Sequence, residues 1–385
     1  MKTILWMYEK ELNPEDGGTE RISDLTMKGL SEKGYICMGF LEFHKNDNSI
    51  IYHKQQISNV YKFLTDNKID IVINQLGYGD WLLKRFYTEG GEQWKKEGGR
   101  VITCLHFDPK QPRQTRRTIF HNWRKKTNKE KIDAIKRYLI APYYENKEER
   151  SIKNIYKYLY ENSDYFVMLS KTHFPYFTSL LKLNDYKKLR AIPNPLTFPD
   201  ISSPDIILNK KKQVLVVARM SEYHKRISSA LKTWKIITQK YLINDWELIL
   251  VGDGPDLQQY KNYAERNNLS GIRFEGQKNP NDYYKNASIF LMTSSAEGWG
   301  LTLTEAMERG VPSVVMESSP VFRDIIDDGK TGFIVPDNEL KTFIDRCLLL
   351  IRNPQKRMEM AKNCLLKAED FTIDKTISLW KEILK

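Results

Sequence analysis

Short apolar runs typical of buried strands alternate with amphipathic helical patterns along most of this 385-residue chain. In the first half, the predicted strands are Ile4–Tyr8, Tyr35–Leu41, Ile69–Asn74, Arg100–Leu105 and Tyr165–Leu169. Helical patterns at 57–67, 83–97 and 149–162 lie between them. Because strands connected through helices run parallel, this alternation predicts an α/β fold with helices on both faces of a parallel sheet.

A proline-rich stretch, residues 193–209, interrupts this alternation at mid-chain with Pro193, Pro195, Pro199 and Pro204. Prolines at this density exclude a long helix or a central strand. The stretch therefore predicts a linker between two lobes. The chain is long enough for each lobe to have a core of its own.

The most informative stretch of the second lobe is residues 288–316. A buried strand at Ile289–Met292 is followed by a polar turn, a glycine-rich loop and a helix that starts at Leu301 and stops near Gly310. This pattern places Glu297 in the loop and Glu305 in the helix. Glycines allow close approach of the backbone to a ligand, and a helix start favours an anion such as phosphate.

Ionised carboxylates only accept hydrogen bonds, so Glu297 and Glu305 suit a ligand with many hydroxyl groups. A phosphate combined with many hydroxyls describes a nucleotide sugar. Two glutamates eight residues apart are more often an exposed helix residue and a loop charge. The strand–loop–helix setting and the loop glycines weigh against that interpretation here.

Two cations follow the first predicted strand of the second lobe, Arg219 directly and Lys225 six residues later. The planar guanidinium of an arginine matches phosphate oxygens, and lysine adds a mobile point charge. Together they would stabilise the negative charge that develops on a leaving diphosphate. Either residue alone is more simply a surface cation of a lysine-rich protein.

Three further glycine turns are candidates for ligand contact. Gly17 and Gly18 open a predicted helix, although Glu20–Ile22 exclude the G-x-G-x-x-G dinucleotide motif. Gly252 lies in the turn after a strand at 247–251, and Gly276 with Gln277 follows a strand at 272–275, where backbone groups could contact the edge of a base.

The segment around Glu297 and Glu305 resembles the E-x7-E region of the family 4 retaining glycosyltransferases, although Trp299 replaces the usual phenylalanine. The spacing of Arg219 and Lys225 is similar to the R-x5-K clamp of that family. The sequence G-G-x-E-R from Gly17 resembles its first loop. The resemblance is strongest over 212–336 and weaker, although ordered, over 1–195.

This resemblance implies the GT-B fold, in which two doubly wound Rossmann-like domains face each other across a cleft. The implied bounds are 1–195 for an acceptor-side domain, 196–370 for a nucleotide-sugar domain, and 371–385 for a last helix that crosses back to the first domain. In such a site Glu305 would bind the ribose, and Arg219 and Lys225 the diphosphate. Residues that would contact the donor sugar or the rest of the donor are His106, Gly17, Gly18, Gly252, Gly276, Gln277, Glu297, Gly298, Trp299, Gly300 and Leu301.

The implied reaction moves a sugar from a nucleoside-diphosphate sugar to an acceptor hydroxyl with retention of the anomeric configuration. The resemblance favours UDP as the carrier, with GDP as the alternative, and surface polysaccharide synthesis as the setting. The acceptor expected is a saccharide or a lipid-linked saccharide. We expect no cofactor and no metal, because the two cations and the helix start would supply the charge and no Asp-x-Asp motif is evident at the site.

The formal net charge is +12, and most of it is local. Eleven Lys or Arg lie between Lys110 and Arg137 against Glu130 and Asp133, an excess of nine. The basic and aromatic residues proposed to contact lipid or acceptor are Arg113, Arg116, Arg117, Trp123, Arg124, Lys125 and Lys126. An anionic membrane surface would bind such a stretch, partly through an amphipathic helix; a solvated basic face is the simpler alternative.

No apolar run approaches the ~20 residues that span a bilayer, and MKTILWMYEK lacks the features of a signal peptide. Cys37, Cys104, Cys347 and Cys364 form no C-x-x-C motif. Reduced structural thiols fit a cytoplasmic protein, which we expect to act there or at the inner face of the membrane.

Two alternative functions remain open at this stage. A nucleotide-sugar epimerase or a phosphorylase could share the fold, although paired glutamates disfavour the first and the absence of a lysine-anchored cofactor segment disfavours the second. A nucleic-acid-binding protein would use the basic stretch and bind with a steep dependence on salt. Since no nucleic-acid motif accompanies the charge, we expect no nucleic-acid partner.

Overall fold

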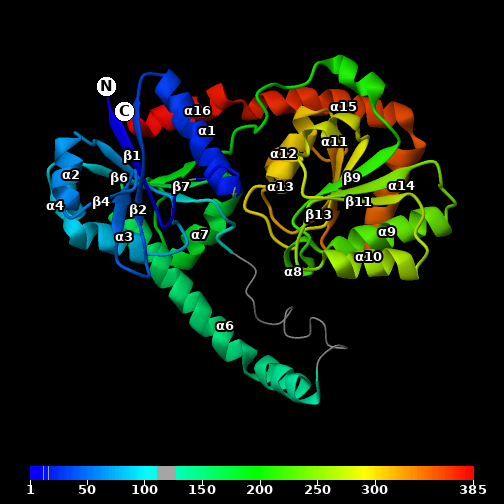
Figure 1. Ribbon diagram of the computed structural model, residues 1–385, viewed down its shortest axis with the longest axis horizontal. Coiled ribbons are helices and arrows are strands. Elements are labelled where there is room, and N and C mark those ends of the chain that lie inside the picture. Colours follow the sequence, from blue (N-terminus) through cyan, green and yellow to red (C-terminus); the bar gives the residue numbers. More distant parts are fainter. Residues whose placement is uncertain (12, 16, 111–126) are drawn as a thin grey trace. The chain divides into compact units, whose positions relative to one another are not determined.

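The computed structural model describes residues 1–11, 13–15, 17–110 and 127–385. The chain forms two compact units (Figure 1). The first unit comprises Met1–Ile192 with Lys381–Lys385, and the second comprises Pro193–Trp380. The proline-rich stretch at 193–209 thus belongs to the second unit, where Pro204–Asn209 forms a 3₁₀ helix.

The first unit contains an eight-stranded sheet in the order β4-β3-β2-β1-β5-β6-β7-β8. Its strands are β1 (Thr3–Tyr8), β2 (Ile36–Phe43), β3 (Ile50–Tyr52), β4 (Gln55–Gln56), β5 (Ile71–Asn74), β6 (Arg100–Leu105), β7 (Tyr165–Met168) and β8 (Leu189–Ala191). The pairs from β2 through β1 to β8 are parallel, as the alternation predicted. All six residues of β1 are buried, which is typical of a strand covered on both faces.

The helices of the first unit are α1 (Gly18–Glu32), α2 (Val60–Asp66), α3 (Trp81–Phe86), α4 (Glu92–Lys96), α6 (Asn128–Asn162) and α7 (Phe174–Leu181). Between α3 and α4, the segment Tyr87–Gly91 forms a π-helical turn that contains Gly90 at φ 117°. This positive φ is not helical, so it breaks the single helix predicted over 83–97. Glycine permits such an angle because it has no Cβ.

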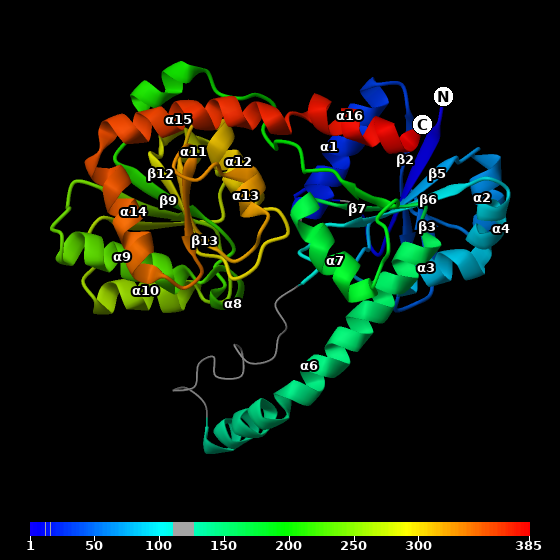
Figure 2. The same cartoon turned by 180° about the vertical axis from the view of Figure 1, so that it is seen from behind.

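Two features of the first unit differ from the prediction. The strands β3 and β4 extend the sheet as an antiparallel hairpin that the sequence pattern did not indicate, because each is only two or three residues long. The helix predicted to start at Glu149 begins at Asn128, where Thr127 and Glu130 form a capping box. In Figures 1 and 2 the first half of α6 extends away from the sheet of its own unit.

The second unit contains a six-stranded parallel sheet in the order β11-β10-β9-β12-β13-β14. Its strands are β9 (Gln213–Val217), β10 (Glu247–Val251), β11 (Ile272–Gly276), β12 (Ile289–Met292), β13 (Ser313–Glu317) and β14 (Gly332–Pro336). Its helices are α8 (Glu222–Lys225), α9 (Ile227–Gln239), α10 (Leu257–Arg266), α11 (Asn281–Asn286), α12 (Leu301–Glu308), α13 (Phe322–Ile325), α14 (Leu340–Arg352), α15 (Pro354–Ala368) and most of α16 (Ile373–Leu384).

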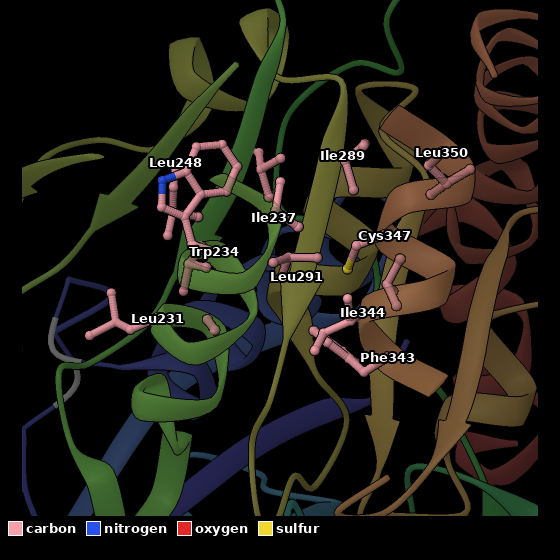
Figure 3. Packing of buried hydrophobic residues seen from close by; sticks show 14 of the residues in the cluster. Leu231, Trp234, Ile237, Leu248, Ile289, Leu291, Phe343, Ile344, Cys347 and Leu350 are labelled. Carbon is pink, nitrogen blue, oxygen red and sulfur yellow. The ribbon is translucent and has the colours of Figure 1, made fainter. Parts of the chain in front are cut away.

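One core of the second unit lies between the sheet and the helices α9 and α14 (Figure 3). Ile289 and Leu291, two residues apart on β12, point to the same face of the sheet, as alternating strand residues must. They pack in one cluster with Trp234 of α9 and with Phe343 and Cys347 of α14. On the opposite face α12 packs against α15, so helices cover both sides of this sheet.

Each sheet has a topological switch point, where the chain, having added strands on one side of the first strand, begins to add them on the other side. This place is called here the reversal point. In the first unit this point lies between β1 and β5, and in the second unit it lies between β9 and β12. At such a point the loops that leave the carboxyl ends of the two strands go to opposite faces, which opens a crevice where ligands of α/β proteins bind. These two places are therefore where functional residues are expected.

Within the described parts of the chain, no helix is both long and apolar enough to cross a membrane. All four cysteines are free thiols, and Cys104, Cys347 and Cys364 are buried. Burial raises the pKa of each of these three thiols above its usual value, so they remain protonated at neutral pH.

Candidate functional site

The cations and the carboxylates singled out in the sequence lie on the two segments that leave the reversal point of the second sheet, namely the loop after β9 with α8 and the loop after β12 with α12. Arg219 and Lys225 follow β9, and Glu297 follows β12, which is the neighbouring strand. A small recess at the ends of these strands is lined by Ala218, Lys225, Glu297 and Thr302, among others. The fold therefore brings together residues that lie 72 positions apart in the sequence.

Lys225 and Glu297 form an ion pair in which the Lys225 Nζ lies 2.5 Å from Glu297 Oε1. Both side chains are largely buried, with 26% and 13% of their surface exposed. Arg219 is exposed, and within the described residues its guanidinium makes no hydrogen bond or ion pair. The site thus holds one cation already paired with a carboxylate and a second cation available to an incoming anion.

The loop after β12 is fastened by Arg226, which the sequence analysis did not single out. The Arg226 side chain donates hydrogen bonds to the carbonyl oxygens of Thr293 and Ser294, both at 2.7 Å. It also pairs with Asp337 at 2.5 Å. Its backbone is left-handed, with φ 47°, and it directly precedes α9. The side chain therefore fixes the loop that carries Glu297 relative to the loop that carries Lys225.

The helix α12 starts immediately after Gly300, whose φ of 95° lies in the left-handed region that favours glycine. No side chain caps this helix start, so its first backbone N–H groups are available to an acceptor. The Trp299 ring is buried and packs edge-on against Phe371 at 5.5 Å. The predicted donor contact at Trp299 would therefore involve its backbone, because the ring belongs to the core.

Glu305 is almost fully buried in α12, with 3% of its surface exposed. Its Oε1 accepts a hydrogen bond from the Thr197 hydroxyl, and its Oε2 accepts one from the Tyr284 hydroxyl, both at 3.0 Å. Thr197 lies in the proline-rich stretch, and Tyr284 lies in α11. These partners fix the orientation of the carboxylate within the helix.

Next to Glu305 on the same helix is Glu308, a fully buried carboxyl group. Its Oε1 accepts a long hydrogen bond, 3.5 Å, from the Phe198 backbone N–H, and its Oε2 has no partner within the described residues. Burial raises the pKa of Glu308 to about 8, an effect that the Arg309 charge opposes and the Glu305 charge reinforces. Glu308 is therefore predominantly neutral at pH 7.

The glycines of the other predicted turns lie at neighbouring strand ends. Gly252 has φ 132°, and a Cβ there would come 2.0 Å from the Ala218 carbonyl oxygen, so the turn after β10 packs directly on the loop after β9. The Gly252 N–H donates to the Gly276 carbonyl oxygen at 2.8 Å. Gln277 follows and is exposed. These three residues therefore form one continuous edge beside the Arg219 loop.

In the first unit, Gly17 precedes the helix α1 and Gly18 begins it, as the glycine pair predicted. Glu20 of this helix is buried and forms an ion pair with Lys10 at 2.7 Å. His106 follows β6, and its Nε2 is hydrogen-bonded to Gln75 Oε1, so that this nitrogen is the donor. Burial lowers the pKa of His106 to about 4, which makes the ring neutral at physiological pH.

The structure therefore joins Lys225 and Glu297 in an ion pair and places Arg219 and Glu305 on the same two segments of the second unit, whereas Gly17, Gly18 and His106 lie in the first unit. The proposed basic patch, residues 113, 116, 117 and 123–126, lies outside the described residues. Among the residues that are described, no group of three or more His, Cys, Asp or Glu is arranged to hold a metal ion.

Comparison with known proteins finds glycosyltransferases similar to this chain. Residues 199–365 match the model of glycosyl transferases group 1. An uncharacterized glycosyltransferase of Haemophilus influenzae is 29% identical over 238 residues, which covers 61% of this chain and 65% of that protein. The amylovoran biosynthesis glycosyltransferase AmsD of Erwinia amylovora is 24% identical over 242 residues, covering 61% and 66%.

Over most of its second unit, the chain is thus similar to group 1, family 4-like glycosyltransferases. A crystal structure of Anabaena Alr3699/HepE in complex with UDP and glucose matches all of this chain and 99% of that one, with a TM-score of 0.67 and 14% identity. This likeness confirms the predicted fold of both units. The matches to the two curated relatives span just under two thirds of their length.

Proposed function

We propose that this protein transfers a sugar from a nucleoside-diphosphate sugar to a hydroxyl group of an acceptor. The observation that carries the proposal is the Lys225–Glu297 ion pair at the reversal point of the second sheet, with Arg219 and Glu305 on the same two segments. The exposed Arg219 would bind the diphosphate, and the uncapped start of α12 would add backbone donors for its oxygens.

Glu305 is suited to the ribose of the donor. Its carboxylate is oriented by Thr197 and Tyr284, and an ionised carboxylate accepts hydrogen bonds from hydroxyls such as those of a ribose. Glu297 would accept hydrogen bonds from sugar hydroxyls while its partner Lys225 turns toward the phosphate. His106 is assigned to positioning of the sugar, for which its neutral ring offers Nδ1 as an acceptor while Nε2 donates to Gln75.

In the reaction, the bond between the anomeric carbon and the phosphate oxygen breaks, and the acceptor oxygen bonds to that carbon. Arg219 and Lys225 stabilise the charge that develops on the leaving diphosphate. The leaving phosphate takes the acceptor proton on the same face, which retains the anomeric configuration and needs no dedicated protein base. We propose that the reaction requires no metal, since these cations and the α12 start supply the positive charge.

We further propose a UDP-sugar as donor, a GDP-sugar being the alternative, and a saccharide or lipid-linked saccharide as acceptor in surface polysaccharide synthesis. The crystal structure of Anabaena Alr3699/HepE contains UDP and glucose, which supports UDP. The relative AmsD is named for amylovoran biosynthesis, which supports a polysaccharide product.

A peripheral position on the cytoplasmic face of an anionic membrane is part of this proposal. Ile132, Ile135, Leu139 and Tyr143 recur at helical spacing along α6 and are exposed, Leu139 by 71%. Lys129 and Lys131 precede them on the same helix, and Lys136 and Arg137 lie between Ile135 and Leu139. Apolar side chains interspersed with cations fit the interface of an anionic bilayer.

A donor panel tests the proposal. Purified protein is incubated with UDP- and GDP-sugars in buffer with EDTA, and sugar release and its anomeric configuration are followed by proton NMR. We expect slow hydrolysis of at least one UDP-sugar, with the configuration retained. Glu297→Gln should lower this rate, whereas Glu265→Gln, an exposed glutamate of α10, should not. The proposal would be contradicted if no donor were turned over, either in the EDTA buffer or in an EDTA-free buffer with Mg²⁺ or Mn²⁺.

A further inference from the structure

Two exposed aromatic side chains lie at the carboxyl edge of the first sheet. Tyr78 follows β5 and Phe107 follows β6, and β5 pairs with β6. Tyr78 is 38% exposed and Phe107 is 41% exposed. Their ring centroids are 5.3 Å apart with the planes at 85°, so the edge of one ring faces the other. The pair, called here the aromatic platform, lies beside the reversal point between β1 and β5.

The backbone holds these rings in place. A Cβ at Gly77 would come 2.3 Å from the Cys104 carbonyl oxygen, so the loop after β5 lies directly on the end of β6. The Tyr78 hydroxyl donates to Glu9 Oε1 at 3.0 Å, which ties the ring to the residue that follows β1. The loops of three adjacent strands thus meet at the platform, and its exposure is built into the fold.

Polar side chains lie at the same edge of the sheet as the aromatic rings. Glu9 provides a partly exposed carboxylate next to Tyr78, and His106, which directly precedes Phe107, is hydrogen-bonded to Gln75. The Nδ1 of His106 is an acceptor with no partner within the described residues. An apolar ring face bordered by hydrogen-bond acceptors is complementary to a pyranose, which presents C–H groups on one face and hydroxyls at its rim.

We propose that the aromatic platform of Tyr78 and Phe107 is the subsite that binds a pyranose ring of the acceptor. This inference rests on the proposed function and specifies its acceptor: a saccharide recognised by its own ring, in contrast to a polyol or a lipid headgroup without a ring. One ring of the platform stacks on the C–H face of the sugar, and Glu9 accepts a hydrogen bond from a hydroxyl at its rim.

Saturation-transfer-difference NMR provides the test. The probes are the methyl glycosides of glucose, galactose and N-acetylglucosamine, with glycerol as a polyol that lacks a ring, each added to the full chain with UDP present. We expect saturation of the ring C–H protons of at least one glycoside and none of glycerol. Tyr78→Ala and Phe107→Ala should each weaken binding of that glycoside about tenfold.

Control variants separate ring stacking from general damage. Tyr78→Phe keeps the ring and removes the hydrogen bond to Glu9, so it should retain most of the glycoside signal. Phe107→Leu keeps apolar bulk without a flat ring face, so this variant should lose the glycoside signal. Tyr186→Ala removes an exposed tyrosine that precedes β8, at the opposite edge of the sheet, and should leave the signal unchanged.

The outcomes distinguish this inference from the proposed function. Thermal stabilisation by UDP, measured on the same preparations, should be equal in the wild type and in all platform variants. Suppose that UDP stabilises the protein, but the glycoside signal persists in both alanine variants or glycerol is saturated as strongly as the glycosides. The acceptor subsite proposed at the aromatic platform is then contradicted, and the proposed donor site is retained. If no nucleotide stabilises the wild type, the proposed function fails, whatever the glycosides do.

Discussion

At the scale of single residues, the candidate site depends on partners that are remote in the sequence. Glu297 and Glu305 could be singled out because the loop glycines and the helix start lie beside them. The hydroxyl groups that orient Glu305 could not be predicted from the sequence, since Thr197 and Tyr284 lie 108 and 21 positions away and belong to other elements. The sequence analysis did not single out Glu308, whose burial and contact with the Phe198 backbone N–H follow from the tertiary fold.

Tyr284→Phe tests whether the orientation of Glu305 matters for the donor. The variant keeps the buried ring and removes one hydrogen bond to Glu305, so we expect the affinity for UDP to fall about five- to tenfold. Calorimetric titration with UDP gives the dissociation constant. Tyr283→Phe is the matched control, because it removes a hydrogen bond to Glu275 instead. Equal losses in both variants would contradict the role given to Tyr284.

Glu308→Gln tests the neutral state of the buried acid. Because the folded protein raises the pKa of Glu308 from 4.5 to about 8, the native state binds one more proton than the unfolded chain between these values. This group therefore contributes stability that is complete below pH 4.5 and is lost as the pH rises toward 8. Its contribution should fall by up to about 1.4 kcal/mol per pH unit.

The measurement is urea unfolding of wild type and Glu308→Gln at several pH values from 5 to 8. Glutamine does not titrate, so the free energy of unfolding of the variant should improve relative to wild type as the pH rises. The sign and the pH slope of this difference test the prediction. A difference that is the same at every pH reports only how well the glutamine amide packs in place of the carboxyl group. A difference that does not vary with pH would show that Glu308 is ionised in the folded protein.

At the scale of elements, the bounds of the buried strands could be predicted from the sequence, whereas the contacts between loops could not. Buried runs such as Ile289–Met292 and Glu247–Val251 have the predicted bounds, because parallel strands covered on both faces are continuously apolar. The hairpin β3–β4 was missed because strands this short carry no periodic signal. Arg226 was missed because its four acceptors lie on two other loops, although its position directly after Lys225 was the available signal.

Arg226→Ala tests whether this side chain holds the loop after β12. Loss of hydrogen bonds to two carbonyl groups and of the ion pair with Asp337 should increase amide hydrogen exchange of the loop at 293–300, while the core strand β10 remains protected. Hydrogen-exchange mass spectrometry resolves both segments. Arg266→Ala, at the exposed end of α10, is the control and should change neither. An unchanged loop in Arg226→Ala would show that other contacts suffice.

At the scale of the whole molecule, the second unit begins at Pro193, the first residue of the proline-rich stretch, whereas the return of the chain's end to the first unit has no such marker. The last five residues belong to the first unit, where the Arg100 guanidinium donates to the carbonyl oxygens of Ile383 and Leu384 at 3.3 and 3.0 Å. A pairing across more than 280 positions leaves no local pattern, so only the family resemblance pointed to it.

The membrane proposal also belongs to this scale. We expect the protein to sediment with vesicles that contain phosphatidylglycerol and not with pure phosphatidylcholine vesicles, with less binding at high salt because the cations are screened. Leu139→Asp, on the exposed face of α6, should weaken binding several-fold without destabilising the fold. Ser151→Asp, at an exposed position further along α6, is the control. Equal binding to both vesicle types would contradict an anionic partner.

The central claim is that the second unit binds a nucleoside diphosphate between the cations after β9 and the helix that carries Glu305. Thermal unfolding with UDP and GDP tests it most directly, in wild type, Arg219→Ala, Glu305→Ala and the control Arg266→Ala. At a hundredfold excess of ligand over its dissociation constant, we expect one nucleotide to raise the melting temperature of wild type and of Arg266→Ala by about 5–10 °C. The rise should be lost in Arg219→Ala and Glu305→Ala; no rise in wild type, or an equal rise in all four proteins, would contradict the account.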